Sequence, residues 1–123
     1  MRRYRLSREG EQVAGTVVVG PEAQPHILQG KGSGAVGALV DALIQSRGVR
    51  AEVEQFDQHA LGSGTGACAM ACVRVRVDHG QARSAVAFGE DTTEAALQAV
   101  LSAVGRSIAK NDAWSASAGR QVR

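Results

Sequence analysis

The feature that most constrains this chain is an internal repeat, which appears when the sequence is shifted against itself by 57 residues. Two stretches with a helical spacing of apolar residues then coincide, and so does the glycine that follows each stretch. A duplicated chain of this kind is expected to fold as two copies of one small supersecondary unit. The coinciding positions are Gly32 with Gly89, Leu39 and Val40 with Ala96 and Leu97, Leu43 and Ile44 with Val100 and Leu101, and Gly48 with Gly105.

Each copy contains one amphipathic helix. Apolar side chains recur three and four residues apart over 36–44 and again over 97–108, so each helix has one face to bury. Gly48 and Gly105 stand where a residue in the left-handed conformation commonly ends a helix. We therefore predict that both helices end at glycine. Three residues are candidate N-caps of the second helix: Asp91, Thr92 and Thr93.

Three strand-like segments precede each helix, at about 3–8, 12–19 and 23–29 in the first copy and 50–58, 69–78 and 81–88 in the second. Apolar and polar residues alternate most clearly over 71–78, which is typical of an antiparallel strand with one exposed face. We therefore predict an α+β fold of duplicated βββα units, in which two antiparallel three-stranded sheets pack around two helices. The units are expected at about 1–48 and 49–109 of a domain covering 1–110, followed by a disordered tail over 111–123.

Composition limits the partners of this domain. Aromatic residues make up only 3% of the chain, so the core must be built from Val, Leu, Ile and Ala. A small domain buries a smaller share of its surface than a large one, and we therefore expect an oligomer. The formal net charge of +2 is far below the positive field that nucleic-acid binding requires.

The location of the protein is predicted from what the sequence lacks. No run approaches the roughly 20 apolar residues of a membrane span, and the N-terminus has no apolar core of a signal peptide. Cys68 and Cys72 lie four residues apart in a predicted strand, where their Cα atoms would be about 13 Å apart and beyond disulfide reach. We expect free thiols and a cytoplasmic protein with neither a membrane nor a nucleic acid as partner.

A glycine-rich turn, residues 32–37, leads into the first helix with the pattern G-x-G-x-x-G, and Asp57 follows 20 residues later. This pattern is a dinucleotide-binding fingerprint. Pro25 and His26 in the preceding strand, and the absence of a further βαβ half, count against that reading. The glycines either make a tight strand-to-helix turn or leave the helix N–H groups free to bind an anion such as a carboxylate.

A second stretch, residues 59–67, consists almost entirely of small residues and lies beside the predicted strand that begins at Ala69. It is either a flexible linker or the wall of an apolar pocket. Together with the glycine-rich turn it would form a pocket with apolar walls and with helix-end donors for a carboxylate. Such a pocket suits an amino acid with a branched side chain.

The sequence offers no convincing catalytic or metal site. His26, His59 and His79 lack metal-ligand spacing, and two cysteines supply only two thiolates. Ser33 and Ser63 lack the strand-turn-helix context of a hydrolase nucleophile, and Cys68 has no base beyond His59. We therefore expect no catalytic residue, no metal and no cofactor in this chain.

Three motifs in register resemble the C-terminal regulatory domain of 2-isopropylmalate synthase. They are Gly30-Lys31-Gly32-Ser33-Gly34 leading into residues 36–43, His59-Ala60-Leu61-Gly62-Ser63-Gly64-Thr65, and residues 95–104. The resemblance covers residues 4–110. It implies an allosteric dimerisation domain that binds leucine and conveys feedback inhibition to a catalytic barrel. A barrel needs about 250 residues, so this chain is expected to be a fragment of a longer synthase, in preference to a free-standing homologue.

The resemblance also implies which residues surround the ligand. The family often has Pro at position 35, Tyr at 56 and Asp at 66, where this chain has Ala, Phe and Gly. Asp57, Glu90 and Asp91 are the candidate partners of the ligand's ammonium group. Isoleucine binding, as in a citramalate synthase, and a dimerisation module without a ligand site are the alternative functions. The implied leucine-binding residues are Gly32, Ser33 and Gly34, through the backbone, and Val36, Gly37, Phe56, His59, Ala60, Ala69 and Ala71 nearby.

Overall fold

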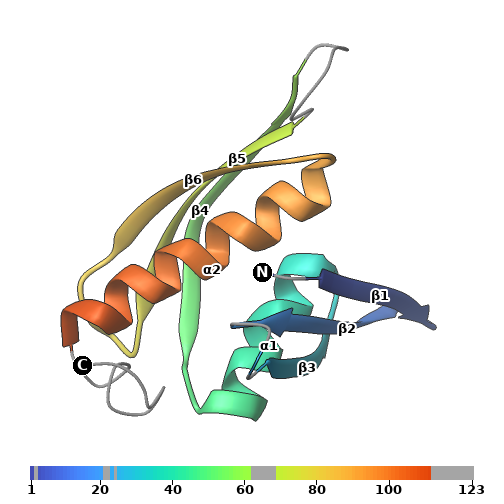
Figure 1. Cartoon of the computed structure of the whole chain (residues 1–123), viewed down its shortest axis with the longest axis horizontal. Coiled ribbons are helices and arrows are strands. Elements are labelled where there is room, and N and C mark those ends of the chain that lie inside the picture. Colours follow the sequence, from blue (N-terminus) through green and yellow to red (C-terminus); the bar gives the residue numbers. More distant parts are fainter. Residues whose placement is uncertain (2, 21–22, 24, 62–68, 112–123) are drawn as a thin grey trace. The chain divides into compact units, whose positions relative to one another are not determined.

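The computed structural model describes residues 1, 3–20, 23, 25–61 and 69–111, with side chains described as far as Ser107. The chain divides into two compact units, Met1–Ala51 and Glu52–Arg123. Each unit contains three strands followed by one helix (Figure 1). The elements are β1 (Arg3–Glu9), β2 (Gln12–Val19), β3 (His26–Gly32), α1 (Ala35–Arg47), β4 (Ala51–Ala60), β5 (Ala69–Val77), β6 (Arg83–Gly89) and α2 (Thr92–Asn111).

The predicted sheets are confirmed. Strands β1, β2 and β3 form one antiparallel sheet in that order, and β4, β5 and β6 form a second. The register of the first sheet pairs Val17 with Tyr4 on one side and with Leu28 on the other. In the second sheet Val73 of β5 pairs with Ala85 of β6. The α+β class predicted from the repeat is therefore correct.

In the first unit α1 packs on β3 and β2. Val17 and Leu28 of the sheet and Leu39 and Leu43 of the helix are almost fully buried, and they form the core of this unit. The helix approaches the sheet so closely at Gly30 that a Cβ atom there would collide with the backbone of Ala42 and Ala38. Glycine is required at that position because any side chain would force the helix off the sheet.

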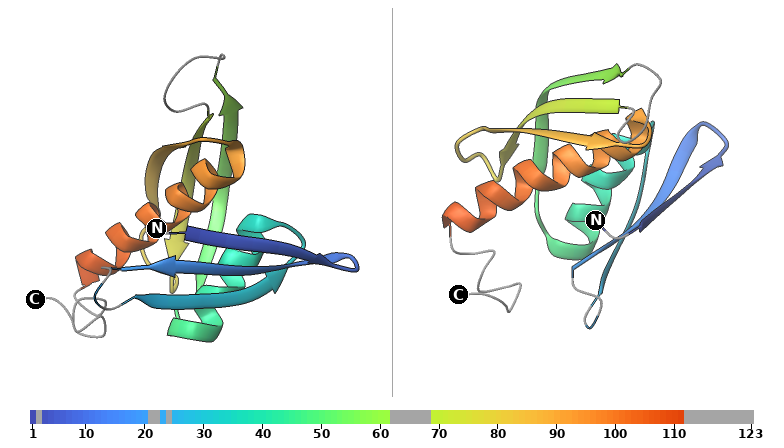
Figure 2. Two further views of the ribbon diagram at one scale, coloured as in Figure 1. Left: turned by 45° about the vertical axis from the view of Figure 1, so that its right-hand side comes forward. Right: turned by 45° about the horizontal axis from the view of Figure 1, so that its top comes forward.

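In the second unit α2 lies along one face of the sheet and contacts β5 and β6 (Figure 2). The helix-facing side chains of β5 are Ala71, Val73, Val75 and Val77, all of them buried, while Arg74 between them is exposed. The alternation predicted for this strand is confirmed. Small residues dominate the buried face of the helix: Ala95, Ala96, Leu97, Ala99, Val100, Ala103 and Val104.

The 57-residue repeat found in the sequence is also present in the structure. A Cβ atom on Gly32 would lie 2.6 Å from the backbone nitrogen of Ala38, and one on Gly89 would lie 2.7 Å from that of Ala95. Each glycine thus allows the end of a strand to touch the first turn of the following helix. The two contacts are related by the same 57-residue shift.

The two helices end differently, and one of the predicted ends is wrong. Helix α1 ends at Gly48, which is left-handed (φ 67°) and donates to the carbonyl of Ile44 at 2.9 Å, as predicted. Helix α2 passes through Gly105 and continues to Asn111. A glycine inside a helix costs only about 1 kcal/mol, and the buried Ser107 shows that the helix still has a face to pack beyond it.

Strand β3 is displaced from its predicted position, because it begins at His26 instead of Ala23 and runs on to Gly32. Pro25 has no N–H to donate to a ladder, so pairing starts after it. Helix α2 extends to Asn111, the first residue of the tail predicted over 111–123, and 112–123 lie outside the described residues, so the predicted tail stays a prediction. Within the described part of the chain, neither helix is long and apolar enough to cross a membrane.

Candidate functional site

The first group of predicted site residues lies where strand β3 passes into helix α1. Gly34 is the N-cap of the helix and has an extended backbone (φ −159°, ψ −173°). Its carbonyl accepts the first helical hydrogen bond, from Ala38 N–H at 2.9 Å. The structure brings five predicted residues together in this turn: Gly32, Ser33, Gly34, Val36 and Gly37.

The N-terminal end of α1 carries no side-chain cap. Gly34 has no side chain to accept a hydrogen bond, and the first turn contains no acidic residue. A Cβ atom built on Gly34 would meet no heavy atom within 4 Å, so the space beside the cap is open. The first N–H groups of a helix lack intrahelical partners, and the helix dipole adds partial positive charge there. This turn therefore has the arrangement by which helices bind carboxylates and phosphates.

The equivalent end of α2 is already capped by its own side chains. Asp91, which the 57-residue shift aligns with Gly34, accepts a hydrogen bond from the N–H of Glu94 at 2.8 Å. The carboxylate of Glu94, aligned with Gly37, accepts one from the N–H of Glu90 at 2.7 Å. Asp91 is thus the cap among the three candidates. The two copies of the repeat differ at this point: the side chain of Asp91 caps the N-terminus of α2, whereas the N-terminus of α1 has no side-chain cap.

The second group of predicted residues lies on β4. Phe56 is 42% exposed, and His59 and Ala60 near the end of the strand are exposed as well. His59 Nε2 lies 3.8 Å from a carboxylate oxygen of Asp57. Asp57 is therefore an accessible carboxylate with an imidazole as its neighbour, whereas Asp91, another candidate for the ligand's ammonium group, serves as a helix cap.

Ala69 and Ala71 occupy a different environment from Phe56. Both alanines are almost completely buried on the side of β5 that faces α2. Phe56 lines a groove on the opposite face of the same sheet. The structure thus places these residues on two faces of one sheet. Residues 62–67 of the predicted small-residue wall (59–67) and the other cysteine, Cys68, lie outside the described residues.

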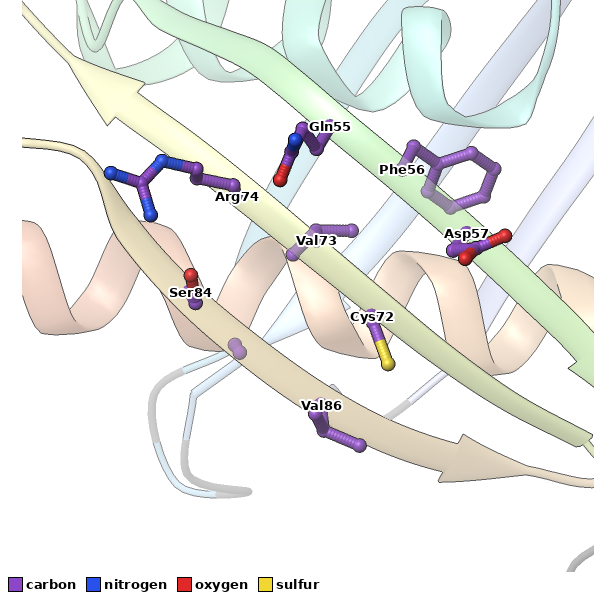
Figure 3. Close-up of a pocket in the computed structure, with 9 residues that line it drawn as sticks. Gln55, Phe56, Asp57, Cys72, Val73, Arg74, Ser84 and Val86 are labelled. Carbon is purple, nitrogen blue, oxygen red and sulfur yellow. The ribbon is translucent and has the colours of Figure 1, made fainter.

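A shallow groove of about 570 Å³ crosses this opposite face of the second sheet (Figure 3). Phe56, Cys72 and Val86 supply apolar surface, whereas Arg74 and Ser84 are polar. Sequence reasoning missed this groove. The signal was present in the alternation of Val86 and Phe88 with Ala85 and Ala87, which places the larger side chains on the face that the helix leaves uncovered. The complete lining is Gln55, Phe56, Asp57, Cys72, Val73, Arg74, Ser84, Ala85 and Val86.

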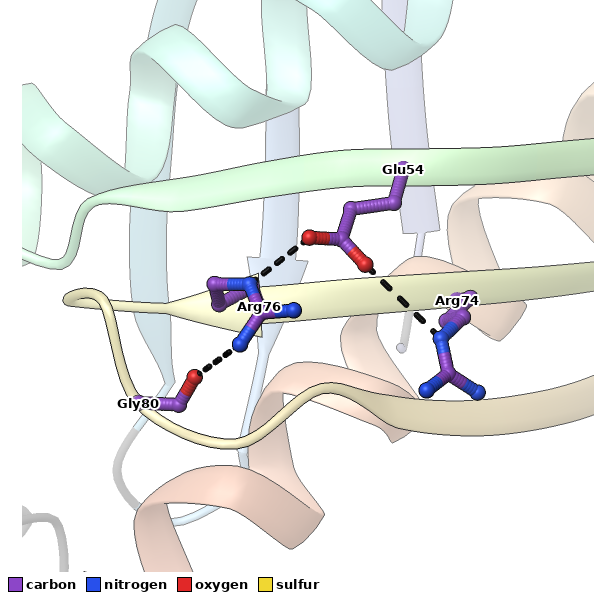
Figure 4. A network of polar contacts seen from close by, with 4 residues as sticks. All are labelled: Glu54, Arg74, Arg76 and Gly80. Carbon is purple, nitrogen blue, oxygen red and sulfur yellow. Dashed lines mark hydrogen bonds and ion pairs between the residues drawn. The ribbon is translucent and has the colours of Figure 1, made fainter.

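Charged side chains form ion pairs at the other end of this face (Figure 4). Arg76 donates from Nε to Glu54 at 2.7 Å and from a terminal nitrogen to the carbonyl of Gly80 at 2.6 Å. Arg74 Nε lies 3.7 Å from the other oxygen of Glu54. The hydrogen bond that Arg76 donates to Glu54 and the negative charge of Glu54 raise the pKa of Arg76 above its ordinary value. These groups form an ion-pair network. Among the described residues, no group of three His, Cys, Asp or Glu side chains is placed to hold a metal ion.

A protein-family model described as "LeuA allosteric (dimerisation) domain" matches residues 3–108 of this chain. The match covers both βββα units and includes the uncapped end of α1.

Curated relatives point in the same direction. The chain is 51% identical over 107 residues to a 2-isopropylmalate synthase of Alcanivorax borkumensis, an alignment that covers 86% of this chain and 19% of that protein. It is 34% identical over 114 residues to a 2-isopropylmalate synthase of Pseudomonas putida, and 34% identical over 113 residues to one of Pseudomonas syringae pv. tomato. Each of these two alignments covers 92% of this chain and 20% of the relative. The chain thus spans about a fifth of the length of the curated relatives it matches.

Proposed function

This chain belongs to the family of LeuA allosteric (dimerisation) domains of 2-isopropylmalate synthase, and we propose that it binds L-leucine and pairs with a second copy of itself. In the parent synthase the bound leucine would convey feedback inhibition to the catalytic barrel. The proposal assigns no catalytic residue and no cofactor to this chain. The free thiol of Cys72 is compatible with the cytoplasm as its location.

The observation that supports leucine binding is the uncapped end of α1. A free amino acid carries a carboxylate, and the N-terminus of α1 has no side-chain cap, no acidic residue in its first turn and open space where a Cβ atom of Gly34 would stand. A carboxylate placed there gains hydrogen bonds and the favourable helix dipole. The backbone of Gly34 is free to be approached closely because no side chain stands in the way.

The N-terminus of α2, in the second copy of the repeat, lacks the features that favour a carboxylate at α1. At the aligned end of α2, the carboxylate of Asp91 already accepts the N–H of Glu94, and the carboxylate of Glu94 accepts the N–H of Glu90 just before the helix, so two negative charges lie there. A ligand carboxylate would be repelled there. The proposal therefore assigns the carboxylate to α1 alone, with one amino-acid site for each chain at this position.

The remaining contacts of the proposed site follow from the family resemblance. Val36 in the first turn of α1 is half-buried and supplies apolar surface. Of the candidate partners for the ammonium group, Asp57 and Glu90 are exposed carboxylates with no helix-capping role. Asp91 is disfavoured because its side chain is engaged by the N–H of Glu94.

Titration calorimetry of the 123-residue chain tests the proposal. We expect saturable heat with L-leucine, weaker binding of L-isoleucine, and none with L-serine, whose side chain has no apolar surface to bury. Tighter binding of L-isoleucine would favour the citramalate-synthase reading. A dimer that gives no heat with millimolar L-leucine or L-isoleucine would refute ligand binding and favour a purely structural dimerisation module.

A further inference from the structure

The outer face of the second sheet, away from α2, carries an exposed apolar surface of five side chains, of which only Phe56 is among the leucine-binding residues that the family resemblance implies. The register pairs Met70 with Phe88 and Cys72 with Val86, so these four side chains share one face of β5 and β6. Phe56 of β4 joins them across the groove with Cys72 and Val86 (Figure 3). We call these five residues the outer patch: Phe56, Met70, Cys72, Val86 and Phe88.

Three side chains of the outer patch are strongly exposed, and the other two, Met70 and Cys72, are half-buried. Val86 and Phe88 are each 54% exposed, and Phe56 is 42% exposed. The chain has only two phenylalanines, and both lie here instead of in the core. Since burying an aromatic side chain is strongly favourable, a chain that builds its core from Val, Leu and Ala and leaves both phenylalanines outside is expected to cover them with a partner.

The charges beside the outer patch favour an identical copy as that partner. Glu54 is bound to Arg76 and approached by Arg74, and the negative charge of Glu52 also acts on Arg76. On the outer face of β4 and β5, the two acidic side chains Glu52 and Glu54 thus balance the two basic side chains Arg74 and Arg76. Two such neutral faces can approach each other without repulsion, whereas a nucleic acid or an anionic membrane would require an excess of positive charge.

The outer face of the first sheet differs in both respects. Ile27 is 58% exposed, and no other large apolar side chain of β1 to β3 is as exposed among the described residues. Its hollow is lined by Arg3 and Arg5 together with Gln29, among others. Two copies of this face would bring like charges together, so it makes an unfavourable surface for self-association and a suitable control.

From this contrast we propose that the outer patch is the centre of the interface between two copies of the chain. The inference rests on the pairing proposed above and assigns it a surface. In a two-fold interface the same patch meets itself, so Val86, Phe88 and Phe56 of one copy would be buried by those of the other. Apolar and aromatic residues at the centre with charged residues at the edge are the usual anatomy of such interfaces.

Sedimentation velocity of the 123-residue chain, Val86→Arg and the control Ile27→Arg tests the assignment. We expect a wild-type dimer, an Ile27→Arg dimer of similar affinity, and a dissociation constant raised at least a hundredfold by Val86→Arg. A wild-type chain that is monomeric at all concentrations, with and without L-leucine, would refute the pairing itself. A wild-type dimer that Val86→Arg leaves intact, or that Ile27→Arg weakens equally, would refute the outer patch as its interface and leave leucine binding untouched.

A second measurement avoids any dependence on the folding of Val86→Arg. In a Cys68→Ser variant, Cys72 is the remaining cysteine and lies at the middle of the outer patch. We expect its rate of reaction with a maleimide to fall at least tenfold as the protein concentration rises through the dimer dissociation constant. A rate that does not change while the protein dimerises would overturn the proposal.

Discussion

The substitution Gly34→Asp is predicted to stabilise the protein and at the same time to weaken leucine binding. It transfers to α1 the cap that α2 already has, because Asp91 occupies the aligned position and accepts the N–H of Glu94 at 2.8 Å. The backbone of Gly34 is extended (φ −159°), a conformation that any residue adopts. A Cβ atom there meets nothing within 4 Å, so no strain offsets the effect.

The substitution is expected to raise the free energy of unfolding and to lower the affinity for leucine. Aspartate is better than glycine as an N-cap by a few tenths of a kcal/mol, and its charge adds about 0.3–1 kcal/mol at a helix N-terminus. We therefore expect a free energy of unfolding higher by about 0.5–1.5 kcal/mol. A second carboxylate about 4 Å from that of leucine costs about 1 kcal/mol in a water-like medium and about 4 kcal/mol at an effective dielectric of 20. The affinity should fall between about fivefold and about a thousandfold.

Urea unfolding and titration calorimetry measure the two effects on the same preparation. Gly34→Ala is the matched control, because it adds the Cβ atom without the charge and should keep most of the affinity for leucine. A Gly34→Asp variant that is more stable but binds leucine as the wild type does would remove the carboxylate from the end of α1. A variant that is less stable would contradict the structural description of the cap.

Two further substitutions test the packing and capping that position this turn. Gly30→Ala should lower the free energy of unfolding of the first unit by about 1–3 kcal/mol, since its Cβ atom would meet the backbone of α1 at Ala42. The control is Gly105→Ala, which has open space inside α2 and should raise the free energy of unfolding by about 0.5–1 kcal/mol. Urea unfolding measures both, and equal effects would contradict the close contact. Asp91→Ala should cost about 0.5–2 kcal/mol because it removes the cap of α2; an unchanged melting temperature would show that the hydrogen bond to Glu94 adds no stability.

The repeat in the sequence was sufficient to predict both sheets, because the period of apolar residues reports directly which face of each element is buried. The end of a helix depends on how the chain continues beyond it. Helix α1 ends at Gly48, which adopts the left-handed conformation, and the chain then turns so that Val49 is buried. The same residue type at Gly105 lies inside α2, because the chain continues to present a buried face at Ser107.

The candidate site was predictable in part for a related reason. The glycines at 32, 34 and 37 mark the turn into α1 whatever the rest of the chain does, and the structure brings them together. The placement of Phe56 opposite the buried Ala71 was not predictable, because which residues share a face of a sheet depends on the register between strands. That register cannot be read from either strand alone.

Amide NMR of the wild-type chain during a titration with L-leucine is the most direct test of the central claim, that the carboxylate of the ligand binds at the N-terminus of α1. The account predicts saturable shifts of the amide protons of Ala35, Val36 and Gly37, with the amide of Glu94 in α2 unaffected by direct contact. Saturable binding of L-leucine that leaves the signals of the first turn of α1 unchanged would contradict it.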